Sequence, residues 1–102
     1  MLIRSEAEVL ADVLRRLESP NRRERRGSFQ VEIASGEFEE ALKDLTDRKA
    51  SYRYLARQID RFGGEVKDAF AKDGPRLVLY AEVNLDRMSA RKIRERLKQL
   101  GS

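Results

Sequence analysis

Every second residue between Arg76 and Leu85 is apolar, and this alternation constrains the fold more than any other feature of the sequence. Successive side chains of a strand point to opposite faces of a sheet, so the pattern predicts a strand with one buried face. Residues 72–75, Lys-Asp-Gly-Pro, form a turn sequence in which glycine supplies a positive φ. Together with residues 65–71 before the turn, these segments predict a β-hairpin.

The same alternation occurs in residues 28–34 and predicts a second half-buried strand. Residues 35–36, Ser-Gly, are expected to end it. The core face of this strand would carry Phe29, Val31 and Ile33, and the opposite face Gln30, Glu32 and Ala34.

Helices are predicted where apolar residues recur at three- and four-residue steps. Residues 5–8 form a capping box that starts the first helix, and Pro20 stops it. Residues 37–62 form either one helix of ~39 Å or two shorter helices that break near 46–49 and cover a sheet better. Asp86 is the expected N-cap of a closing helix.

The order helix, strand, one or two helices, two strands, helix predicts an α+β fold. A chain of 102 residues has room for one core, so residues 1–102 are expected to form a single domain. We expect a three-stranded sheet with the helices packed mainly on one face. The segment 19–27 carries four arginines and is expected to be a basic, flexible loop.

The stretch from Tyr54 to Val66, followed by a hairpin and an amphipathic helix, resembles the second half of a KH-type RNA-binding domain. The resemblance implies that residues 47–50, Asp-Arg-Lys-Ala, take the place of the Gly-x-x-Gly loop that clamps a nucleic-acid backbone in that family. The order of elements is also similar to that of a winged helix, with residues 50–62 as recognition helix and the hairpin as wing. We therefore expect a KH-like or winged-helix-like arrangement.

The sequence contains neither cysteine nor histidine, which excludes disulfides and thiolate catalysis and removes the commonest general base. We expect no enzyme, no catalytic or metal-binding residues, no cofactor and no small-molecule substrate. A weaker alternative is a nuclease, because Asp60 with Glu65 and Lys67 resembles the metal and catalytic positions of the PD-(D/E)xK family. The N-terminus lacks a signal-peptide core and no apolar run approaches ~20 residues, so we expect a cytoplasmic protein without a membrane partner.

Basic residues recur in three separate segments, although the formal net charge is only +4. The acids must therefore be concentrated elsewhere, for example at Glu37, Glu39 and Glu40, and the molecule is expected to be polarised. Arginine outnumbers lysine by 16 to 6, which favours bidentate binding of phosphate and is compatible with a thermophilic protein. Tyr54, flanked by arginines at helical spacing, is placed to stack on a base.

These observations predict a non-enzymatic protein that binds nucleic acid through its phosphate backbone, with RNA favoured over DNA. Two alternatives remain: a homodimeric adaptor, because Val78 and Tyr80 make the second face of the hairpin strand partly apolar, and a winged-helix DNA-binding regulator. The predicted nucleic-acid-binding residues are Arg22, Arg23, Arg25, Arg26, Arg53, Tyr54, Arg57, Arg61, Arg91 and Arg94.

Overall fold

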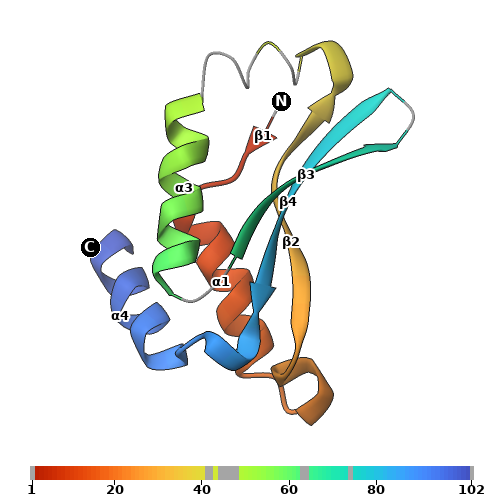
Figure 1. Ribbon diagram of the computed structural model, residues 1–102. Coiled ribbons are helices and arrows are strands. Elements are labelled where there is room, and N and C mark those ends of the chain that lie inside the picture. Colours follow the sequence, from red (N-terminus) through yellow and green to blue (C-terminus); the bar gives the residue numbers. More distant parts are fainter. Residues whose placement is uncertain (1, 41–42, 44–48, 63–64, 74, 102) are drawn as a thin grey trace.

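The structure is a computed structural model that describes residues 2–40, 43, 49–62, 65–73 and 75–101. One antiparallel sheet, in the strand order β1-β2-β4-β3, is covered by helices on one face, which makes the protein a small α+β domain (Figure 1). The elements are β1 (Leu2–Ile3), α1 (Glu6–Leu17), the 3₁₀ helix η1 (Arg22–Arg25), β2 (Ser28–Glu37), α3 (Lys49–Arg61), β3 (Glu65–Asp73), β4 (Arg76–Asn84), the 3₁₀ helix η2 (Leu85–Arg87) and α4 (Ala90–Gly101).

Helix α1 begins at the predicted capping box. The Ser5 hydroxyl accepts a hydrogen bond from the Glu8 amide at 3.2 Å and donates one to the Glu8 carboxylate at 3.1 Å. Acidic residues occupy the first turn and basic residues the last, which is the favourable arrangement in the field of the helix dipole. The predicted start of this helix is confirmed.

The predicted hairpin is confirmed in its two strands, since β3 and β4 pair antiparallel from Glu65 opposite Glu82 to Asp73 opposite Arg76. Its expected glycine turn includes residue 74, which lies outside the described residues. The alternation in β4 places Leu77, Leu79, Ala81 and Val83 in the core.

Strand β2 differs from its prediction in length and in the side that one residue faces. It extends to Glu37, because Gly36 and Glu37 pair with the first residues of β4. An irregularity between Glu32 and Ala34 inserts one residue, which changes the parity of the strand. Ala34 is therefore buried beside Ile33, and the prediction that it faces outward is wrong.

The prediction of three strands is also wrong, because Leu2 and Ile3 form the short edge strand β1 opposite Ser35 and Ala34. A strand of two residues is too short to be recognised from an alternation of apolar and polar side chains. The expected KH-like or winged-helix-like arrangement is not confirmed. Residues 44–48, which contain most of the break expected at 46–49 and part of the segment matched to the Gly-x-x-Gly loop, lie outside the described residues.

The closing helix starts three residues later than predicted. Asp86 lies in η2, where its amide donates to the side-chain oxygen of Asn84 at 3.0 Å, so its assignment as N-cap is wrong. Ser89 precedes α4 instead and accepts a hydrogen bond from the Lys92 amide at 3.4 Å.

The core lies between the sheet and the three described helices. Each helix contributes side chains that solvent does not reach: Val9, Leu10 and Val13 from α1, Leu55 and Ile59 from α3, and Ile93 from α4. Each such side chain stabilises the fold by about 1.5–3 kcal/mol relative to an exposed position. Because these contacts fix the helices on the sheet, they also fix where the exposed basic residues lie.

Candidate nucleic-acid interface

The segment predicted as a flexible loop contains the 3₁₀ helix η1, held by polar side chains. Asn21 caps it by accepting a hydrogen bond from the Arg23 amide at 3.0 Å. The Ser19 hydroxyl accepts from the Asn21 amide at 3.2 Å and donates a short hydrogen bond to the Glu24 carboxylate. Gly27 then enters β2 with a φ of 78°, in the left-handed region that favours glycine. The segment is thus a turn held by its own hydrogen bonds.

The arginines of this turn are exposed, and no described residue forms an ion pair with any of them. Their guanidinium groups keep all their donors for a ligand, and guanidinium binds phosphate oxygens in pairs. The four residues are Arg22, Arg23, Arg25 and Arg26.

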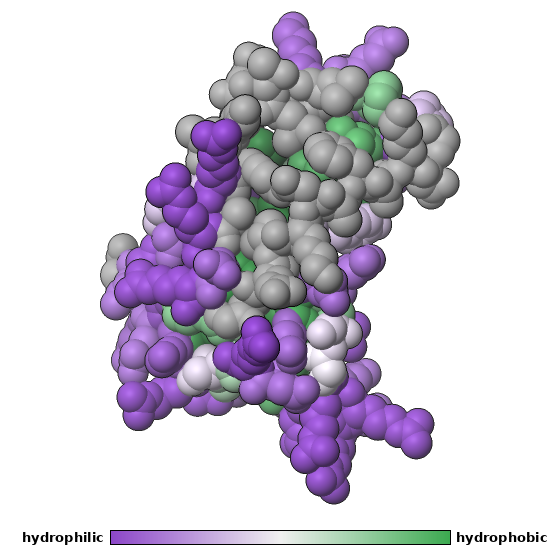
Figure 2. Space-filling view, in the orientation of Figure 1, coloured by the Kyte–Doolittle hydropathy of each residue, from purple (hydrophilic) through white to green (hydrophobic). Residues whose placement is uncertain are grey.

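Two further segments meet η1 at the same end of the molecule. The Leu85 amide of η2 donates to the Gly27 carbonyl at 2.8 Å, and Arg94 of α4 pairs with Glu18, just before η1, at 3.0 Å. Figure 1 shows η1, η2 and the start of α4 at its lower end, and Figure 2 shows hydrophilic side chains projecting there. We call residues 15–29 and 84–95 the basic end.

The basic end concentrates positive charge. It holds ten basic and four acidic residues, whereas the whole chain has a net charge of +4. The remainder of the chain is therefore net acidic, as expected for a polarised molecule. The exposed carboxylates of Glu37, Glu39 and Glu40 follow the opposite end of β2 from η1.

Helix α4 carries basic side chains at its N-terminus, which is the positive end of the helix dipole. Its first turn contains Arg91 and Lys92 and no acidic residue, the reverse of the arrangement in α1. Arg91 is paired with Glu95 at 3.7 Å, but both side chains are largely exposed, so this ion pair contributes little. Cations beside the free amides of a helix N-terminus are unfavourable, and a bound anion would offset the repulsion.

The predicted basic stripe on α3 is exposed but lies apart from η1. Arg53 and Arg57 belong to α3, which lies on the other side of the view from η1 (Figure 1), so the structure does not bring them together with the arginines of the turn. Arg61, at the end of α3, approaches α4 and lines a cavity of about 250 Å³ with Lys92 and Gln99. The predicted residues therefore form two surfaces, joined only at α4.

Tyr54 is 49% exposed, and its hydroxyl accepts a hydrogen bond from Arg96 of α4 at 2.9 Å. The same guanidinium donates to both carboxylate oxygens of Glu6, at 2.7 and 3.1 Å. Hydrogen bonding to Glu6 raises the pKa of Arg96 above its ordinary value, opposed by desolvation and assisted by the charge of Glu6 and by Tyr54. Sequence analysis did not predict this cluster. Glu6 lies in the first turn of α1, where the helix dipole alone already explains an acidic residue.

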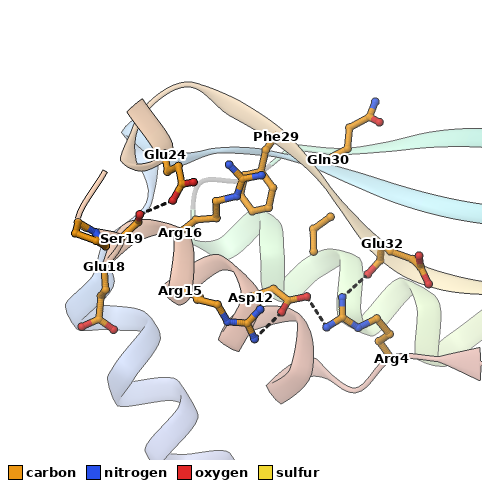
Figure 3. Close-up of a pocket in the computed structure, with 12 residues that line it drawn as sticks. Arg4, Asp12, Arg15, Arg16, Glu18, Ser19, Glu24, Phe29, Gln30 and Glu32 are labelled. Carbon is orange, nitrogen blue, oxygen red and sulfur yellow. Dashed lines mark hydrogen bonds and ion pairs between the residues drawn. The ribbon is translucent and has the colours of Figure 1, made fainter. Parts of the chain in front are cut away.

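An open groove of about 900 Å³ lies between α1, η1 and β2, next to the basic end (Figure 3). The Arg16 guanidinium lies over the Phe29 ring, 4.8 Å from its centroid. Phe29, which the sequence placed on the core face of β2, is half-buried, packs against the core and also lines the groove. The groove is lined by Arg4, Asp12, Arg15, Arg16, Glu18, Ser19, Pro20, Glu24, Phe29, Gln30, Val31 and Glu32.

Two of the four carboxylates that line the groove, Asp12 and Glu18, are paired with arginines. Asp12 binds Arg4 at 2.5 Å and Arg15 at 3.1 Å. Arg4 also donates to the Glu32 carbonyl at 3.2 Å, so its charge holds the first helix to β2. Arg15 and Arg16 are exposed and remain directed toward solvent. The groove thus offers a cationic aromatic wall beside η1.

Among the described residues, no group of three or more acidic side chains is placed to hold a metal ion. Asp60, one member of the nuclease pattern, is exposed on α3. In the described part of the chain, none of the helices combines the length and the apolar character that a membrane crossing requires. Comparisons with family models, with curated proteins and with solved structures found no match to this chain.

Proposed function

We propose that the protein is a non-enzymatic nucleic-acid-binding module that holds the phosphate backbone at its basic end, with RNA favoured over DNA. The observation that carries the proposal is the meeting of η1, η2 and the start of α4, where four exposed arginines have no ion-pair partner among the described residues. Such groups bind phosphates and release counterions, independently of base sequence.

The geometry of η1 supports contact with more than one phosphate. Side chains three residues apart are eclipsed in a 3₁₀ helix, so Arg22 and Arg25 share one ridge and Arg23 lies on the next. Arg91 and Lys92 extend the same positive end along the first turn of α4. A strand that crosses this end would meet guanidinium groups in succession, and it would lower the repulsion within α4.

A KH-like arrangement is our proposal for the finer fold, in preference to a winged helix. From β2 onward the elements are strand, helix, two strands and helix, with β4 between β2 and β3. Strand β2 has ten residues, longer than the short first strand of a winged helix. This preference is the reason for favouring RNA.

The adaptor alternative stays a prediction without a specific observation in its favour. Val78 and Tyr80 on the second face of β4 are half-buried. Among the described residues, the large hydrophobic side chains that are exposed are Tyr54 and Leu100, which lie on different helices, α3 and α4. A contiguous apolar patch of the size typical of an interface is not formed by these residues.

The test is a fluorescence anisotropy titration of the full chain with short single-stranded RNA, single-stranded DNA, duplex RNA and duplex DNA, each over a series of salt concentrations. We expect binding at low salt, with the logarithm of the affinity falling linearly with the logarithm of salt concentration at roughly −0.7 per single-strand phosphate contact. Absence of binding to all four at micromolar protein and low salt would refute the proposal.

A further inference from the structure

The groove beside the basic end has one planar cation supported by one aromatic ring. Arg16 of α1 lies over Phe29 of β2 at 4.8 Å, and Arg16 is exposed (Figure 3). A guanidinium group has two flat faces, and the ring occupies one of them. Arg16 is exposed and lines the groove, so its guanidinium group is available for a ligand to stack on.

We propose that this groove receives one unpaired nucleobase of the strand held at the basic end, stacked on the guanidinium group of Arg16. This inference rests on the proposed function and adds a preference for single strands, because a base can leave its stack and enter a pocket only where it is not paired. The volume of about 900 Å³ lies within the range of small-molecule sites and accommodates a base with its sugar.

One wall of the groove belongs to the segment that presents the basic residues. Ser19 and Glu24, which belong to the turn that presents the arginines, form the wall nearest the basic end. A strand bound along η1 thus enters the groove directly.

Two of the four carboxylates that line the groove are neutralised by arginines. The carboxylate of Asp12 is neutralised by two arginines, and that of Glu18 pairs with Arg94. Arg15 adds a further exposed cation beside Arg16. The groove therefore carries no unpaired carboxylate at Asp12 or Glu18 to repel the phosphates on either side of the base.

Arg16→Lys tests the stacking plane, because it keeps the charge and removes the flat guanidinium. Arg76→Lys is the matched control, since Arg76 is likewise exposed but lies at the start of β4, outside both the basic end and the groove. The probes are single-stranded RNA, single-stranded DNA, an abasic strand of equal length and a duplex. Affinities are measured by anisotropy at one low salt concentration, and far-ultraviolet circular dichroism verifies that each variant is folded.

We expect Arg16→Lys to weaken binding of the base-containing single strands about fivefold or more, with no change for the abasic strand or the duplex. Arg76→Lys should leave all four affinities unchanged. Stronger binding of the RNA than of the DNA strand would identify RNA as the source of the base. Equal affinity of the unmodified protein for base-containing and abasic strands, or an equal loss on all probes in Arg16→Lys, overturns the inference but leaves backbone binding intact. Failure to bind any probe removes the proposed function itself.

Discussion

Arg96 of α4 forms a two-pronged ion pair with Glu6 of α1, from Nε at 2.7 Å and from Nη2 at 3.1 Å. Parallel hydrogen bonds of this kind are both stronger and more directional than a single contact. The Glu6 side chain is almost fully buried, and the same guanidinium reaches Tyr54 of α3. One side chain thus joins all three described helices and fixes α4, whose first turn belongs to the basic end.

Breaking this pair from either side is expected to destabilise the protein, because each change leaves one charged partner without its counterion. Glu6→Gln and Arg96→Met should each lower the urea midpoint of unfolding, and the double variant should lose less than the sum of the two. Equilibrium urea denaturation followed by circular dichroism measures all four states. Strict additivity would show that the two side chains are not coupled.

The raised pKa of Arg96 fixes the pH range over which the pair acts. A cation whose folded pKa is raised contributes stability that is fully present below its unfolded pKa and is lost only above its folded value. Arg96 therefore stays charged throughout the mildly alkaline range, whereas a lysine in Arg96→Lys, whose unperturbed pKa is about 10.4, begins to lose its stabilising charge as the pH rises above that value. The stability difference between the protein and this variant should widen as the pH rises through that value, and urea titrations at neutral and alkaline pH measure it.

The basic end should dominate the salt dependence of nucleic-acid binding. Replacing Arg22, Arg23, Arg25 and Arg26 together by glutamine removes up to four phosphate contacts and should reduce the slope for single strands by roughly 3. The matched control, Arg53→Gln with Arg57→Gln on α3, should change the slope by less than about 1. Anisotropy over a salt series compares the variants, and a larger effect of the α3 pair would move the interface to that helix.

Lys92→Glu should separate stability from binding. With Ser89 as the capping residue, the new carboxylate would complete the same capping box that starts α1, and it would replace a cation at the positive end of α4. The free energy of unfolding should rise by about 0.3–1 kcal/mol, while nucleic-acid affinity falls. Thermal unfolding and anisotropy are measured on the same sample, and a loss of stability would contradict the assigned start of α4.

Gly27→Ala should cost about 1 kcal/mol for conformational reasons alone. Gly27 has a φ of +78°, and a Cβ atom added there meets nothing within 4 Å. Gly101→Ala is the control, since that site is equally open but lies at the end of α4 and has no positive φ. It should be neutral or stabilising in urea denaturation, because alanine is the better helix former.

Where local patterns decide structure, the sequence was a sufficient guide to the fold. The capping box at residues 5–8 and the alternation from Leu77 to Val83 involve neighbouring residues only, and both are confirmed. The errors arise from long-range pairing. Strand β1 exists because Ile3 pairs with Ala34, and the changed face of Ala34 follows from the register against β4.

The candidate site was predictable in its residue types but not in its partners. The exposed arginines of η1 follow from composition and spacing, whereas no local pattern relates Arg96 to Glu6 or Arg94 to Glu18. Arg16 lies on a helix and Phe29 on a strand, and the pattern of side chains within each element gives no information about the other. Their contact therefore appears only once α1 packs beside β2.

The turn that carries the arginines is held by Ser19, Asn21, Glu24 and the backbone of Gly27, and by none of the arginine side chains. The contacts that hold the turn are therefore separate from the arginine side chains that we propose bind the ligand. Substitutions at the arginine positions should leave those contacts in place, which makes the turn a ready graft site for redirecting the protein to ligands of a different charge.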